Sequence, residues 1–142
     1  PELARVMGNY LSHSTSAPST ISQHAAIVAL RGPQEDMQAM KRAFEKRRDH
    51  LVGRMNRIAG VSCIKPQGAF YVFPSIKKFG MTSDEFALKL LEEEKVAVVP
   101  GTAFGDCGEG YLRISYAYSL NDLKRALERM ERFVKRHLNE EK

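Results

Sequence analysis

Arg113 lies at a position in the sequence where it could bind a ligand. Arg113 lies in an apolar segment, residues 111–117, which follows a glycine-rich loop at 104–110. Side chains alternate between the two faces of a strand, so Arg113 is expected to share its face with Ser115. A guanidinium is a planar fork that matches a carboxylate with two parallel hydrogen bonds. Arg113 is therefore a candidate carboxylate receptor, although the residues alone slightly favour an ion pair with an acidic neighbour such as Glu109.

Two other stretches could line a pocket. The turn at 66–68 leads directly into Phe70 and Tyr71, and such aromatic residues can form a pocket wall but lie more often in a core. The hydroxyl run Ser14, Thr15 and Ser16 precedes a helix and could contact an anion, but an ordinary capping loop explains it more simply. The loop at 104–110 has no lysine and opens no helix, so it is not predicted to bind phosphate.

Composition excludes several classes of protein. The 142 residues form one domain, or one domain and a fragment of another, with ordinary apolar and charged shares of 43% and 27%. The net charge of +5 suggests nucleic acid, but the basic residues alternate with acidic ones at helical spacing, which is typical of a solvated face. No apolar run is long enough for a membrane span. The two cysteines and four histidines show no metal-ligand spacing, which indicates reduced thiols in a cytoplasmic protein.

Hydrophobic periodicity predicts five helices. The first two cover residues 2–12 and 20–31, the second opening with a capping box of Thr20 and Gln23. The third is long, about 34–58, with one apolar stripe and a stop at Gly60. A fourth begins at a capping box of Thr82 and Glu85, and Ser119 caps the last.

Strands are predicted at 61–64, 69–73, 96–99 and 111–117. The segment 69–73 is apolar on both faces, so we expect it to be central and buried. The predicted fold class is α+β: a small mixed or antiparallel sheet of three to four strands covered by helices, with the long helix near the N-terminus.

Together these residues resemble the C-terminal part of a fold-type I, pyridoxal-phosphate-dependent aminotransferase of class I/II, in the aspartate aminotransferase family. The resemblance covers nearly the whole chain. It depends on three stretches: STSAPSTISQ at 14–23, PQGAFYVF at 66–73, and VVPGTAFG at 98–105 followed by YLRISYA at 111–117.

The resemblance implies a role for each candidate. Arg113 would bind the α-carboxylate of the substrate, and Phe70 would lie beside that substrate. The loop with Ser14 and Thr15 would lie near the interface of a homodimer and approach the active site of the partner. No residue of this chain is expected to be catalytic or to bind a metal.

The resemblance also implies a division of the chain. Residues 1–32 would end the large cofactor domain, and residues 33–142 would form the small domain, with 33–58 as the interdomain helix. The lysine that holds pyridoxal 5'-phosphate as a Schiff base has no counterpart among the lysines here. The full-length protein would exchange an amino group between an amino acid and a 2-oxo acid, while this chain alone is expected to be inactive.

Two other functions remain open from the sequence. An aminotransferase-like domain can serve as the effector domain of a transcription regulator, and a stand-alone basic module could bind nucleic acid. The substrate side chain is also open: aspartate is the first expectation, and aromatic amino acids and alanine are close behind.

Overall fold

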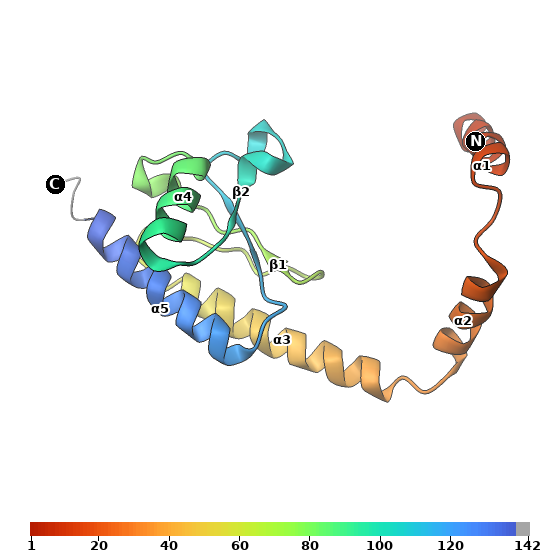
Figure 1. The fold of residues 1–142 in the computed structure, drawn as a ribbon, viewed down its shortest axis with the longest axis horizontal. Helices are drawn as coiled ribbons and strands as arrows, with labels where there is room; N and C mark the ends of the chain where they lie inside the picture. The colour runs from red at the N-terminus through yellow and green to blue at the C-terminus, as the bar shows by residue number, and fades with distance from the viewer. Residues whose placement is uncertain (139–142) are drawn as a thin grey trace. The chain divides into compact units, whose positions relative to one another are not determined.

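The computed structural model describes residues 1–138 and separates into two compact units. The first is Pro1–Gln38 and the second begins at Ala39 (Figure 1). The break falls inside the long helix α3 (Glu35–Met55), whereas the sequence predicts a domain boundary between residues 32 and 33. The assignment of these parts to a large and a small domain stays a prediction.

The first unit consists of α1 (Glu2–Ser14), α2 (Thr20–Arg31) and the start of α3. No residue of α1 or α2 is buried; Ile21 and Leu30, for example, are 82% and 83% exposed. The predicted capping box at Thr20 is wrong. Ser19 is the N-cap and makes no side-chain cap hydrogen bond, while the Gln23 side chain donates to the Pro18 carbonyl at 2.8 Å. Gln23 lies one residue too far along the helix for the reciprocal bond.

The long helix α3 ends at Met55, three residues earlier than its apolar stripe predicts. Asn56 stops it, because its side chain donates to the Cys63 carbonyl at 2.9 Å and accepts from the Cys63 amide at 2.8 Å. Only the C-terminal half of the stripe is buried. Leu51 and Met55 are 2% and 1% exposed, whereas Met40 is 58% exposed.

The sheet has three antiparallel strands in the order β1–β3–β2. These are β1 (Tyr71–Val72), β3 (Leu112–Ser115) and β2 (Val99–Pro100). The sequence prediction that 69–73 is central and buried is wrong. This segment lies at an edge with Phe70 and Phe73 about 40% exposed, because β3 takes the central place by pairing on both sides. The predicted strand at 61–64 is reduced to one bridge between Ser62 and Ser75.

Helices α4 (Ser83–Glu94) and α5 (Leu120–His137) complete the second unit with α3. Figure 1 shows α3 and α5 side by side, and Arg54 of α3 is paired with Glu131 of α5 at 3.2 Å. The core lies between these helices and the sheet. Its aromatic centre is formed by Phe79, Phe86 and Phe133, with Phe86 and Phe133 in edge contact at 4.9 Å between centroids. The α+β class and the small antiparallel sheet are thus confirmed.

Two helix starts follow the sequence closely. At α4, Thr82 Oγ1 accepts from the Glu85 amide at 3.2 Å and the Glu85 carboxylate accepts from the Thr82 amide at 2.9 Å, which is the predicted capping box. At α5, Ser119 Oγ accepts from the Asp122 amide at 3.1 Å. Both caps satisfy amides that have no partner inside the helix.

Three short 3₁₀ helices connect the strands: η1 (Lys77–Phe79), η2 (Gly101–Phe104) and η3 (Asp106–Gly108). The segment 101–110 packs against itself so closely that a Cβ on Gly101 or Gly108 would lie 2.0 Å from the carbonyl oxygen of the other. Such an approach of two backbones requires glycine at both positions.

A buried serine fastens this segment to α4. Ser83, fully buried at the start of the helix, accepts through Oγ from the amides of Gly110 at 2.8 Å and Tyr111 at 3.2 Å. Glu109 Oε1 accepts from the amides of Ser83 and Gly110 at 2.8 and 3.0 Å. The entry to β3 is therefore held by side-chain hydrogen bonds as well as by the sheet.

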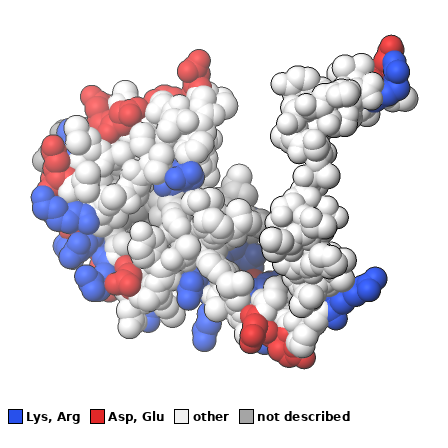
Figure 2. Space-filling view, turned by 45° about the vertical axis from the view of Figure 1, so that its right-hand side comes forward, with Lys and Arg blue, Asp and Glu red and all other residues white. Residues whose placement is uncertain are grey.

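A group of charges joins the ends of α4 and α5. Glu94, 7% exposed, accepts from Arg132 at 2.7 Å and from Arg136 at 2.8 Å, and Glu93 accepts from Arg136 at 2.9 Å. Burial by itself would raise the pKa of Glu94, but these arginines outweigh it and the pKa lies below its ordinary value of 4.5. On the face shown in Figure 2, blue and red atoms both lie among mostly white ones.

We expect Glu94→Gln to lower the free energy of unfolding of the second unit by about 1–2 kcal/mol at pH 7, since both arginines are partly exposed and screened by solvent. The folded-state pKa of Glu94 is below its unfolded value, so this stabilisation is present above pH 4.5 and is lost as the pH falls through the folded-state pKa. Urea unfolding at pH 7 and at decreasing acidic pH measures both effects. The exposed Glu92→Gln is the control, and an equal deficit for Glu94→Gln at every pH would contradict the assignment.

We expect Ser83→Ala to lower stability by about 1–2 kcal/mol, because the amides of Gly110 and Tyr111 lose a buried acceptor. Hydrogen exchange of these two amides should become faster. Ser62→Ala, at an exposed serine, should leave both rates unchanged. Protection of Gly110 and Tyr111 that survives Ser83→Ala would show that the serine does not hold the loop.

Candidate functional site

Arg113 occupies the middle of the central strand. Val99 of β2 lies opposite it, and the neighbouring residues of β3 pair with β1. Leu112 and Tyr116, 0% and 2% exposed, belong to the core, whereas Arg113 is half-buried on the face predicted for it. Hydrogen bonds on both sides hold the backbone of β3, so the base of this side chain is fixed by the fold.

The guanidinium of Arg113 contacts two aromatic rings and no acid. Its Cζ lies 4.5 Å from the centroid of Tyr71 and 4.7 Å from that of Phe104. Among residues 1–138, no carboxylate oxygen lies within ion-pair distance of it. The alternative of an ion pair with Glu109 is wrong, because Ser83 and Gly110 take that carboxylate. The guanidinium can therefore bind an anion that does not belong to residues 1–138.

Phe70 begins the neighbouring strand, and its position depends on a strained turn. Ala69 has a left-handed backbone with φ 58°, which costs an alanine about 1 kcal/mol. The hydroxyl of Tyr116 donates to the Ala69 carbonyl at 2.8 Å, and the Tyr116 amide donates to the Phe70 carbonyl at 2.9 Å. These two bonds fix the turn, so that the Phe70 ring lies against the Tyr71 ring in a tilted contact, with 4.5 Å between centroids. Tyr71 thus connects Phe70 to Arg113.

Phe70 lines a pocket of about 300 Å³ at this end of the sheet. Of the two interpretations that the sequence left open, the pocket wall agrees with its 43% exposure and the buried core does not. The wall combines aromatic rings with groups of both charges: Lys41, Phe44, Glu45, Arg48, Gln67, Gly68, Ala69, Phe70 and Tyr116.

Ser14 and Thr15 belong to the first unit. Ser14 Oγ donates to the Tyr10 carbonyl at 2.9 Å, and Thr15 Oγ1 donates to the Leu11 carbonyl at 3.3 Å. Both hydroxyls therefore satisfy the last turn of α1. A role at a partner's active site stays a prediction.

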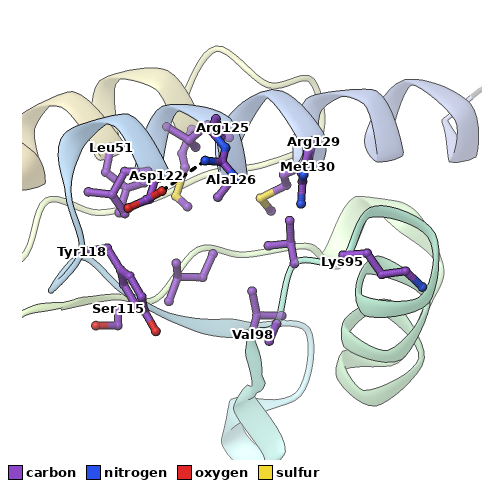
Figure 3. A pocket seen from close by; sticks show the side chains of 16 residues that line it. Leu51, Lys95, Val98, Ser115, Tyr118, Asp122, Arg125, Ala126, Arg129 and Met130 are labelled. Atoms are coloured by element: carbon purple, nitrogen blue, oxygen red, sulfur yellow. Dashed lines mark ion pairs between the residues drawn. The ribbon is translucent and has the colours of Figure 1, made fainter.

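A second pocket, of about 270 Å³, lies between α5 and the strands (Figure 3). Its floor is mostly apolar, and Asp122 and Arg125 form an ion pair of 3.5 Å at its rim. Arg113, Phe70, Ser14 and Thr15 do not line it. Among the described residues no group of three or more His, Cys, Asp or Glu is placed to hold a metal, and no helix could cross a bilayer.

Three residues of the site were missed from the sequence. Tyr71 and Phe104 contact Arg113, and Ser83 fixes the loop that carries Phe104. From the sequence, Tyr71 is only the neighbour of Phe70. The sequence does carry a signal for Tyr71. If 69–73 and 111–117 pair as neighbouring strands, side chains on the same face contact each other diagonally across the pair, and Tyr71 and Arg113 can be two of these side chains. Nothing in the sequence marks Ser83 as more than a residue of the first helical turn.

The residues around Arg113 fit one end of a substrate. The guanidinium suits a carboxylate, and the rings provide apolar cover. The two rings that contact Arg113 offer no group that could attach pyridoxal phosphate, so these residues do not fit that role.

Known proteins resemble this chain in sequence and in structure. The family model for aminotransferase class I and II matches residues 1–130. Aspartate aminotransferase from Bacillus subtilis is 45% identical over 141 residues, covering 96% of this chain and 35% of the relative. Among solved structures, aspartate aminotransferase from Rhizobium meliloti has a TM-score of 0.80 and 41% identity over 95% of this chain. It is covered over 36% of its own length.

An aromatic aminotransferase from Pyrococcus horikoshii is equally similar, with a TM-score of 0.80 and 42% identity. The match covers 90% of this chain and 35% of that one. The chain thus spans about a third of the length of the relatives it matches. Family members typically depend on pyridoxal phosphate. The chain belongs to the class I and II aminotransferase family.

Proposed function

We propose that this chain is the substrate-carboxylate-binding, C-terminal part of a pyridoxal-phosphate-dependent aminotransferase. The observation that supports this most strongly is Arg113, a half-buried arginine on a central strand whose guanidinium is not neutralised by any described carboxylate. Charge-assisted hydrogen bonds to such a group contribute about 1.5–3 kcal/mol each. Two parallel bonds would fix both the position and the orientation of a substrate.

In this proposal the chain binds and orients, and other parts of the protein do the chemistry. Arg113 holds the α-carboxylate, which limits rotation of the substrate and aligns the bond to the α-hydrogen. Phe70 lies beside the substrate and covers it from water. The cofactor and its Schiff-base lysine belong to residues outside this chain, so the 142-residue chain alone is inactive.

The proposal extends to assembly. Residues 1–32 belong to a large domain, 33–58 form the interdomain helix, and 33–142 form the small domain. The full-length enzyme is a cytoplasmic homodimer in which Ser14 and Thr15 approach the partner's active site. The exposed apolar residues of α1 and α2 support this, since such faces are usually covered in a complete protein.

Aspartate is the proposed amino donor, with 2-oxo acids as acceptors. Its support is that relatives called aspartate aminotransferase reach 45–46% identity. An aromatic-amino-acid aminotransferase from Thermococcus litoralis is 43% identical. The sequence identities therefore favour aspartate over aromatic amino acids by only a small difference.

We expect Arg113→Lys in the full-length enzyme to lower kcat/KM for L-aspartate by about 10- to 100-fold, through a higher KM and a lower kcat. Lysine keeps the charge but loses the planar fork. Steady-state kinetics with L-aspartate and 2-oxoglutarate measure the effect. Arg125→Lys, at an arginine 68% exposed on α5, is the matched control and should change neither constant. Unchanged kinetics for Arg113→Lys would refute the carboxylate assignment.

A further inference from the structure

The guanidinium of Arg113 is held by two rings, and we propose that Tyr71 and Phe104 form an aromatic clamp that positions it for the substrate carboxylate. Both are positioning residues, because they act through Arg113. The inference rests on the proposed function, since the clamp has a purpose only if Arg113 binds a carboxylate.

The two rings reach Arg113 from opposite neighbours of its strand. Tyr71 belongs to β1, which pairs with one edge of β3. Phe104 ends η2, which follows directly from β2 on the other edge. The distances from the Arg113 Cζ to the two centroids, 4.5 and 4.7 Å, are nearly equal. The side chain is therefore flanked on both sides.

Rings hold a guanidinium without using its donors. An aromatic face attracts the cation through its quadrupole, whereas all five N–H groups point outward in the plane of the guanidinium. A carboxylate partner within the chain would have occupied those N–H groups. Aromatic contacts restrict the side chain and leave its edge open for a carboxylate in the same plane. Less conformational freedom is then lost when the substrate binds.

Each ring is itself held by the fold. Tyr71 makes a tilted ring contact with Phe70 at 4.5 Å between centroids. Phe104 lies edge-on to Phe73 at 6.2 Å, and Phe73 stacks on Tyr111 at 5.5 Å. Thr102, two residues before Phe104, donates through its hydroxyl to Asp84 of α4 at 2.9 Å. The clamp therefore exists before any ligand arrives.

The first test examines the free 142-residue chain by NMR. The side-chain Nε–H signal of Arg113 is assigned by its loss in Arg113→Lys. Ring currents from Tyr71 and Phe104 should displace this signal from the position of an exposed arginine. Phe104→Leu and Tyr71→Leu should each return it toward that position, whereas Phe104→Tyr and Tyr71→Phe should preserve the displacement. Tyr118→Leu, at a tyrosine 62% exposed that has no contact with Arg113, is the control.

The second test measures steady-state kinetics with L-aspartate for the same variants in the full-length enzyme, because this chain alone carries only part of the substrate site. Each leucine variant should raise the KM for L-aspartate by about threefold to fivefold, as expected when one cation–π contact is lost. The conservative variants and Tyr118→Leu should bind as the wild type does. Backbone spectra identify any variant that does not fold, and the two leucine variants serve as independent tests of one clamp.

The outcomes separate the two proposals. If Arg113→Lys raises the KM for L-aspartate in the full-length enzyme but both leucine variants keep the wild-type KM, the clamp is overturned and the proposed function stands. If the Arg113 signal is not displaced in the free chain, the clamp is also overturned. If Arg113→Lys leaves the kinetics of the full-length enzyme with L-aspartate unchanged, the proposed function fails, and the positioning role fails with it.

Discussion

The pairing of β3 on both edges is the constraint on which the rest of the second unit depends. A strand of four residues is too short to be stable alone, and neighbours of two residues each add little by themselves. Their antiparallel registers place Tyr71 opposite Ser115 and Val99 opposite Arg113. One face of β3 then enters the core through Leu112, while the other presents Arg113 between elements contributed by both edges.

The loop before β3 connects the central strand to helix α4. Ser83 and Glu109 connect the start of α4 to the amides at the entry of the strand, and Gly101 and Gly108 allow two backbone segments to meet. Phe104 lies inside this segment. Its position beside Arg113 is thus set by hydrogen bonds at the far end of the loop. The buried pairs of Glu94 with Arg132 and Arg136 hold α4 and α5 together behind it.

Exposed apolar side chains mark the faces where the described residues provide no cover. They include Phe70 and Phe73 at the edge of the sheet, Met40 on α3, and much of α1 and α2. A periodic apolar stripe predicts a helix equally well whether its partner surface is within the chain or elsewhere. This is why the stripe of α3 predicted the helix correctly but did not reveal that only its last turns are buried.

The sequence by itself determined what depends on neighbours along the chain. Caps at Thr82 and Ser119 formed as predicted because their partners lie three residues away, and the alternation in 111–117 placed Arg113 on its face. Tertiary structure decided the rest. The end of α3 depends on the contact of Asn56 with Cys63, and the edge place of 69–73 depends on which strand pairs twice. The absence of an ion pair at Arg113 likewise depends on residues distant in sequence, because Ser83 binds Glu109, and rings from β1 and from η2 contact the guanidinium instead.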